Sequence, residues 1–207
     1  MGKIGIMGGT FDPIHNGHLM LGEQAYREYG LDEVWYMPSG HPPHKKNHPV
    51  TEPALRFEMT KLAVKGHKGL FCSDFEVRRS GNTYTAQTLS LLRKSYPGHT
   101  FYFIIGADSL YEIESWYEPG LVLTQAVILA ARRKYEEVDR DQAMDRQISY
   151  LSKKYGADIR MLHCEEMDIS SAGLRQMIAN GQSVEEFVPG EVLSYISAHG
   201  LYREAEA

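Results

Sequence analysis

At 207 residues, of which 43% are hydrophobic and 24% charged, the chain has the size and composition of one folded domain. Its formal net charge of −5 at pH 7 excludes a broadly basic surface for nucleic acid, and no apolar run is long enough to span a membrane. The two cysteines, Cys72 and Cys164, lack C-x-x-C spacing, which argues against a zinc ribbon or a disulfide scaffold and favours a cytoplasmic location.

The first predicted strand and helix are joined by a glycine-rich loop. Residues 4–7 predict a buried strand, and from His18 the apolar spacing becomes helical until Gly30 ends the helix. Between them, Gly8 and Gly9 let backbone N–H groups approach a ligand closely, because no Cβ stands in the way. A strand that enters a helix through glycines places unpaired N–H groups where a phosphate can bind.

Two histidines follow this loop. His15 and His18 are three residues apart, so both can point to one side at the entrance of the helix, with Gly17 leaving space between them. Imidazoles beside amide donors suit a phosphate chain whose negative charge grows in a transition state. The pattern is neither G-x-x-x-x-G-K-[ST] nor G-x-G-x-x-G. The plainer alternative is a glycine turn with two surface histidines.

The run Gly8-Gly9-Thr10-Phe11-Asp12-Pro13, followed by His15-x-Gly17-His18, resembles the nucleotidyltransferases with a (H/T)-x-G-H signature. Within that group, the chain is similar to the bacterial nicotinate-nucleotide adenylyltransferases as far as about Tyr202. The resemblance implies that His15 and His18 are catalytic. It also implies that ATP is bound by Gly8, Gly9, Thr10 and Phe11.

A second strand is expected at residues 33–37, and a proline-rich loop with three histidines and two lysines follows it. The loop is locally positive in an acidic chain. A solvated loop is one interpretation, and a zinc site from His41, His44 and His48 is another, although no nearby carboxylate or cysteine completes it. The resemblance implies that His44 and Lys45 bind the phosphate of nicotinate mononucleotide.

A helix is expected from about Pro53, because proline is tolerated in the first turn. Its buried stripe includes Met59, and we expect Arg56 and Lys61 on its solvent-exposed face. A short third strand is expected at residues 70–72.

Thr85 is predicted to N-cap a helix that runs to Tyr96, with Leu89 and Leu92 facing inward. The resemblance implies that Thr85 lines the nicotinate pocket, where N–H groups receive the carboxylate. Both roles are compatible, since a helix N-terminus favours an anion.

The apolar run at residues 100–105 predicts another buried strand. Ligands of parallel sheets gather beyond the carboxyl ends of strands, where Asp108 falls. Its carboxylate can accept ribose hydroxyls, help to hold magnesium, or cap the following helix. The resemblance implies that Gly106 and Asp108 bind ATP. It further implies that Trp116 and the backbone of Tyr117 bind nicotinate mononucleotide, although a tryptophan is also a common core residue.

The remaining expected elements are a strand at 125–131, a helix at 139–155 and a strand at 158–162. Ser170 and Ser171 then predict a second phosphate-facing helix N-terminus, and Arg175 returns to the face of Ser171. The family motif is Ile-Ser-Ser-Thr-x-Ile/Leu-Arg, which implies that Ser170, Ser171 and Arg175 bind ATP. Ala172 departs from it and removes one hydroxyl.

The alternation of strands and helices predicts a Rossmann-like, doubly wound parallel sheet. We expect a single domain over residues 1–207 whose C-terminal part, at about 170–202, is helical.

The resemblance implies transfer of the adenylyl group of ATP to nicotinate mononucleotide, which gives nicotinate adenine dinucleotide and pyrophosphate in NAD biosynthesis. Mg²⁺ is expected to arrive with ATP, with no metal site of the protein's own. Alternatives are another acceptor, such as phosphopantetheine or nicotinamide mononucleotide, and a non-catalytic nucleotide-binding regulator. Whether the protein is a homo-oligomer is left open.

Overall fold

The computed structural model of the protein describes residues 1–42, 50–131, 138–164 and 169–203. In these residues six strands form one sheet in the order β3-β2-β1-β4-β5-β6, and every neighbouring pair is parallel. The strands are β1 (Lys3–Gly9), β2 (Glu33–Pro38), β3 (Leu70–Cys72), β4 (Thr100–Gly106), β5 (Val127–Ala131) and β6 (Ile159–Leu162). The predicted Rossmann-like, doubly wound sheet is confirmed.

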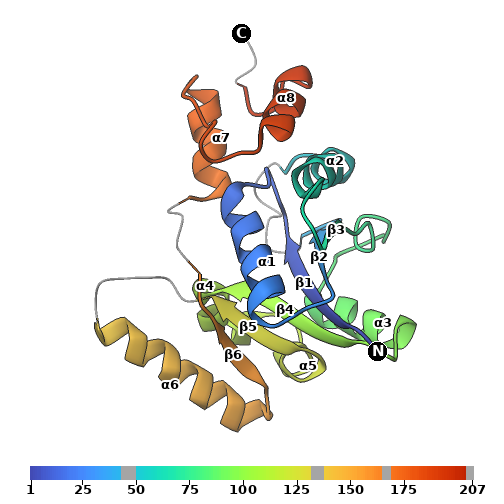
Figure 1. Ribbon diagram of the computed structural model, residues 1–207, viewed down its shortest axis with the longest axis vertical. Coiled ribbons are helices and arrows are strands. Elements are labelled where there is room, and N and C mark those ends of the chain that lie inside the picture. The colour runs from blue at the N-terminus through green and yellow to red at the C-terminus, as the bar shows by residue number, and fades with distance from the viewer. Residues whose placement is uncertain (43–49, 132–137, 165–168, 204–207) are drawn as a thin grey trace.

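Helices cover both faces of this sheet (Figure 1). One layer holds α1 (Asn16–Glu28), α2 (Pro53–Val64), α7 (Ser171–Ala179) and α8 (Gly190–Ala198). The other holds α3 (Thr85–Ser95), α4 (Ala107–Glu112), the 3₁₀ turn η2 (Ile113–Ser115), α5 (Pro119–Gln125) and α6 (Val138–Tyr155). In Figure 1, α7 lies beyond one end of α1, and α8 lies beside α2.

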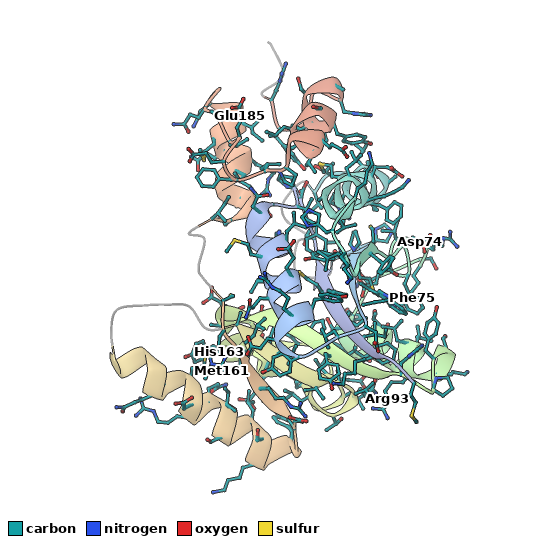
Figure 2. All side chains as sticks on the ribbon, viewed as in Figure 1. Asp74, Phe75, Arg93, Met161, His163 and Glu185 are labelled. Carbon is teal, nitrogen blue, oxygen red and sulfur yellow. The ribbon has the colours of Figure 1, made fainter. Side chains whose placement is uncertain are left out.

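The central strands β1, β4 and β5 are buried on both faces over most of their length, so their sequences are apolar without alternation. On β1, Ile6 packs in the layer of Leu89, while its neighbour Met7 packs in the layer of Leu19. Figure 2 shows that side chains fill the space on both sides of the sheet. Burying one such side chain fully contributes about 1.5–3 kcal/mol, so the two layers fix the carboxyl ends of the strands in place.

Tyr36 of β2 sets the position of helix α1. A Cβ at Gly22 would lie 2.0 Å from the Tyr36 hydroxyl oxygen, so only glycine allows this close approach. The fully buried hydroxyl donates to the carbonyls of His18 (3.0 Å) and Leu19 (3.2 Å). The first turn of α1, which carries His18, is therefore anchored to the sheet.

Two local expectations were wrong. Tyr84, and not Thr85, is the N-cap of α3, and its side chain makes no capping hydrogen bond, so Thr85 is the first helical residue. Gln125 ends helix α5 and does not begin a strand, since β5 starts at Val127. Pro119 in the first turn starts this unpredicted helix, because its fixed φ suits a helix N-terminus. No helix of the described residues combines the length and apolar character that crossing a membrane requires.

Candidate active site

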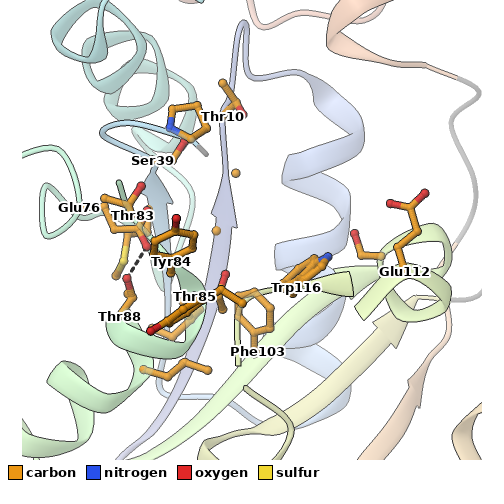
Figure 3. A pocket seen from close by; sticks show the side chains of 18 of the residues that line it. Thr10, Ser39, Glu76, Thr83, Tyr84, Thr85, Thr88, Phe103, Glu112 and Trp116 are labelled. Carbon is orange, nitrogen blue, oxygen red and sulfur yellow. Dashed lines mark hydrogen bonds between the residues drawn. The ribbon is translucent and has the colours of Figure 1, made fainter. Parts of the chain in front are cut away.

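A cavity of about 420 Å³ opens at the carboxyl ends of β1 and β4. The chain leaves β1 toward one layer of helices and β4 toward the other, and ligands of such sheets bind where the two directions part. Figure 3 shows Thr10 at the tip of β1, Ser39 on one side of that strand, and Trp116 with Glu112 on its other side. Of the residues predicted to bind substrates, those that line it are Gly8, Gly9, Thr10, Thr85, Trp116 and Tyr117.

Aromatic rings form one wall of this cavity. The partly buried Trp116 meets Phe103 of β4 edge to face, with ring centroids 6.2 Å apart. Tyr84 and Tyr117 lie against each other, with centroids 4.5 Å apart, and both line the cavity. A flat aromatic ring fits between such surfaces, because offset stacking and edge-to-face contacts are both favourable.

Another part of the cavity lining is polar and was not predicted from the sequence. The Thr88 hydroxyl donates to the buried Glu76 carboxylate (2.6 Å) and accepts from the Arg79 guanidinium (3.0 Å). Burial raises the pKa of Glu76, while Thr88 and Arg79 oppose that shift. Ser39 lines the cavity, and its buried hydroxyl has no hydrogen-bond partner among the described residues. No local pattern marks Glu76 or Ser39, because tertiary packing alone brings them here.

The two histidines of the first turn lie side by side, as predicted. Their rings stack with centroids 3.7 Å apart, and the His15 backbone N–H donates to His18 Nδ1 at 3.3 Å. Because Nδ1 of His18 accepts, its neutral ring carries the proton on Nε2. A Cβ at Gly17 would lie 3.1 Å from His15 Nδ1, so Gly17 leaves room for the His15 ring.

Both imidazoles are neutral at neutral pH. Burial lowers the pKa of His15 to about 4. Burial also lowers the pKa of His18 well below its usual 6.5, and a charge on His15 would lower it further. The pair therefore offers neutral N–H donors to a ligand, and it does not act as a pair of fixed cations.

The turn between β1 and α1 has donors available. Among the described residues, neither the Thr10 nor the Phe11 backbone N–H has a hydrogen-bond partner. Phe11 has a φ of +51°, which is uncommon for a bulky residue, and its buried ring holds it there by packing near Tyr36 and His18. The turn thus resembles an anion-binding nest.

Arg56 of α2 binds the turn between β1 and α1. The prediction that its side chain faces solvent was wrong. Its side chain is fully buried, and it donates to the carbonyls of Thr10 (2.6 Å), Ser39 (2.7 Å), Gly40 (3.2 Å) and Thr51 (2.8 Å). Carbonyls at the ends of β1 and β2 thus satisfy the guanidinium where water cannot. Arg56 lies three residues before the buried Met59, so helical spacing places both residues on the inward face of α2.

Helix α7 holds the same turn from the other side. Ser170 is the N-cap, and its hydroxyl accepts from Gly173 N–H at 3.1 Å. The Ser171 hydroxyl donates to the Pro13 carbonyl (2.9 Å), and Arg175 donates to the Asp12 carbonyl (2.7 Å). The predicted helix N-terminus is therefore present and adjoins the turn with the histidines.

Comparison with known proteins decides the family of this chain. The profile described as cytidylyltransferase-like matches residues 6–177. A relative from Lachnoclostridium phytofermentans, named "Probable nicotinate-nucleotide adenylyltransferase", is 46% identical over 98% of this chain and 100% of its own length. One of the same name from Dehalococcoides mccartyi is 38% identical over 97% of each chain. The chain belongs to the nicotinate-nucleotide adenylyltransferase family.

Solved structures of the family share the fold. The Plasmodium falciparum nicotinic acid mononucleotide adenylyltransferase complexed with NaAD matches with a TM-score of 0.80, covering 98% of each chain at 20% identity. The same enzyme complexed with APC matches with a TM-score of 0.77 at the same identity and coverage. At this identity the likeness concerns the arrangement of helices and strands.

Some family positions lie away from the cavity or outside the described residues. Gly106 is the N-cap of α4, and Asp108 is an exposed residue of its first turn, so neither is part of the cavity lining. His44 and Lys45 lie outside the described residues, as does His48 of the alternative zinc site. Within the described residues, no group of three or more histidine, cysteine or acidic side chains is arranged to hold a metal ion.

Proposed function

We propose that the protein transfers the adenylyl group of ATP to nicotinate mononucleotide, giving nicotinate adenine dinucleotide and pyrophosphate. One observation carries this proposal: a cavity with an aromatic wall opens onto a turn that presents free backbone donors, with a neutral histidine pair following it. The cavity suits a pyridine ring, and the turn suits a phosphate chain. The names of the relatives agree with this reaction.

The reaction needs no general base. An oxygen of the ionised 5′-phosphate of nicotinate mononucleotide attacks the α-phosphorus of ATP and forms a new P–O bond. The bond from the α-phosphorus to the bridging oxygen breaks, and pyrophosphate leaves with that electron pair. Alignment of the two phosphates and stabilisation of the growing negative charge account for the rate.

The histidine pair and the turn supply that stabilisation. We assign the Nε2–H of His18, the imidazole of His15 and the N–H groups of Thr10 and Phe11 to oxygens of the transferring phosphate. Neutral donors cost less to bury than cations before the substrates arrive. Mg²⁺ would enter with ATP as part of that substrate and would neutralise part of the charge of its phosphates.

Helix α7 is assigned to the outer phosphates of ATP. The hydroxyls of Ser170 and Ser171 already have protein partners, so we assign their contribution to the N-terminal N–H groups of α7. Arg175 uses one N–H group on the Asp12 carbonyl and retains others for phosphate. This assignment uses no hydroxyl at position 172, where the chain has alanine and the family motif has threonine.

The other substrate is assigned to the cavity. Trp116 contacts the pyridine ring, the backbone of Tyr117 binds the same substrate, and the N-terminus of α3 at Thr85 receives the nicotinate carboxylate. A helix N-terminus favours an anion over a neutral amide, which supports nicotinate over nicotinamide mononucleotide. His44 and Lys45 remain assigned to its phosphate. The cytoplasmic location stays a prediction.

Parallel assays test the proposal. Purified protein, ATP and Mg²⁺ are incubated with nicotinate mononucleotide, nicotinamide mononucleotide or phosphopantetheine, and pyrophosphate and the adenylated product are both measured. We expect the highest kcat/KM with nicotinate mononucleotide. A preference for either other acceptor overturns the substrate assignment. ATP binding without pyrophosphate release overturns the enzymatic function in favour of a regulator.

A further inference from the structure

The carboxylate of Asp12 is buried in the turn between β1 and α1, with only 2% of the residue exposed. The Tyr202 hydroxyl donates to Asp12 Oδ1 at 2.7 Å, and the Thr51 N–H donates to Oδ2 at 3.2 Å. The Arg56 guanidinium attracts the same carboxylate. A buried charge costs several kcal/mol unless it is paired in this way, so these partners determine where Asp12 lies.

Tyr202 reaches this site from 190 residues further along the chain. It follows α8 and has a φ of +63°, a left-handed conformation that few non-glycine residues adopt. Burial and the Asp12 carboxylate raise the pKa of Tyr202, so its hydroxyl remains a donor at neutral pH. The left-handed backbone of Tyr202 is strained, and it places the Tyr202 hydroxyl against the buried Asp12 carboxylate. Other interactions of the fold must therefore offset this strain to maintain the contact.

We propose that Tyr202 is a positioning residue for ATP, which holds the phosphate-binding turn in its donor-presenting conformation through Asp12. The inference rests on the proposed adenylyl transfer. Arg56 donates to the Thr10 carbonyl and Arg175 donates to the Asp12 carbonyl, so both bind the backbone of the turn. Tyr202 instead binds the side chain of Asp12. The turn needs such support because Phe11 has an unfavourable positive φ. Without the Tyr202 hydroxyl, the N–H groups of Thr10 and Phe11 lose their alignment toward phosphate.

The Tyr202→Phe variant tests this role, with Tyr195→Phe as the matched control. Both remove one hydroxyl from the C-terminal helical part, but the Tyr195 hydroxyl has no hydrogen-bond partner among the described residues. A hydrogen bond to a charged group is worth about tenfold or more in an equilibrium. We expect Tyr202→Phe to raise KM for ATP about tenfold and to leave KM for nicotinate mononucleotide within twofold. Tyr195→Phe leaves both values unchanged.

Binding of a non-hydrolysable ATP analogue by calorimetry gives a readout independent of turnover. We expect its Kd to rise about tenfold in Tyr202→Phe at a temperature where circular dichroism shows full folding. Asp12→Ala should weaken binding as well, and the double variant should bind no worse than Asp12→Ala alone, because the Tyr202 hydroxyl acts only through the side chain that Asp12→Ala removes.

Three outcomes overturn the inference. Tyr202→Phe binds the analogue as tightly as Tyr195→Phe does, or the two substitutions at Asp12 and Tyr202 have additive effects, or only kcat falls, in proportion to the fraction of folded protein. If the wild-type protein transfers no adenylyl group to nicotinate mononucleotide, the proposed function fails. The analogue-binding experiment still tests the role of Tyr202 in that case.

Discussion

His15 and His18 stack with their ring centroids 3.7 Å apart, and the backbone N–H of His15 donates to Nδ1 of His18. This contact selects one tautomer of His18 and leaves Nε2–H as its donor. Because burial lowers the pKa of both rings, we expect the pair to meet a phosphate as neutral hydrogen-bond donors. The substrates supply the negative charge. Because the imidazoles of His15 and His18 are both neutral, they do not repel each other before a substrate binds.

Removing the His18 imidazole should therefore affect the chemical step. We expect His18→Ala to lower kcat about 100- to 1,000-fold, the cost of losing one preorganised donor to a transition state. His163→Ala is the control, since that exposed histidine directly follows β6 and pairs with Glu28. Steady-state kinetics and circular dichroism measure activity and folding. Turnover within threefold of wild type in folded His18→Ala would contradict its assigned role.

The His15 ring should also make stability depend on pH. Its pKa is about 4 in the folded protein, against an unperturbed value of 6.5 in the unfolded chain, so the unfolded chain binds more protons between these values. Stability should thus be complete above pH 6.5 and fall as the pH drops toward 4. Between pH 7.5 and pH 5 the loss from this one group is about 2 kcal/mol.

Urea unfolding of wild type and His15→Asn at these two pH values measures that loss. Asparagine does not titrate, so the variant should lose about 2 kcal/mol less than wild type over the same range. Carboxylates, and the histidines that do not contact His15, contribute equally to both proteins and cancel in the difference. Equal losses in the two proteins would mean that His15 is not held neutral by the fold.

The fold was predictable because each strand has a clear local pattern. The apolar runs at residues 4–7 and 100–105 match β1 and β4, and Gly30 ends α1 with a φ of +56°. The position of the histidine pair also followed from local spacing, since residues three apart share a side of a helix. The alternation of strands and helices indicated the parallel, doubly wound arrangement, whereas the order of the strands came from the structure.

The contacts that support the site could not be predicted in the same way. Asp12 and Tyr202 meet across 190 residues, and no spacing rule connects them. Glu76 and Ser39 face the cavity only because separate loops converge there. Arg56 is a different case, because its helical spacing indicated burial while its charge suggested solvent. The prediction from its charge was wrong, because carbonyls at the strand ends replace water around the guanidinium.

Arg56 should be among the residues that contribute most to stability. Arg56→Met removes a buried guanidinium and leaves the carbonyls of Thr10 and Ser39 without their donor, which should cost about 3–5 kcal/mol. Lys61→Met is the control on the same helix, with 61% of its side chain exposed, and should change stability by less than about 0.5 kcal/mol. Urea unfolding at pH 7.5 measures both. Equal stability of the two variants would show that the carbonyls find other partners without Arg56.

The Trp116 ring should determine affinity for the pyridine substrate alone. Trp116→Ala removes the ring that meets Phe103 in the cavity wall, and one lost stacking surface with its buried area should raise KM for nicotinate mononucleotide about 10- to 100-fold. Trp116→Phe retains an aromatic face and should restore most of that affinity. KM for ATP should stay within twofold in both variants, because the assigned phosphate donors lie on the β1–α1 turn and on α7. Steady-state kinetics with each substrate varied in turn separates the two effects, and a parallel rise in both KM values would place Trp116 in the support of the whole site.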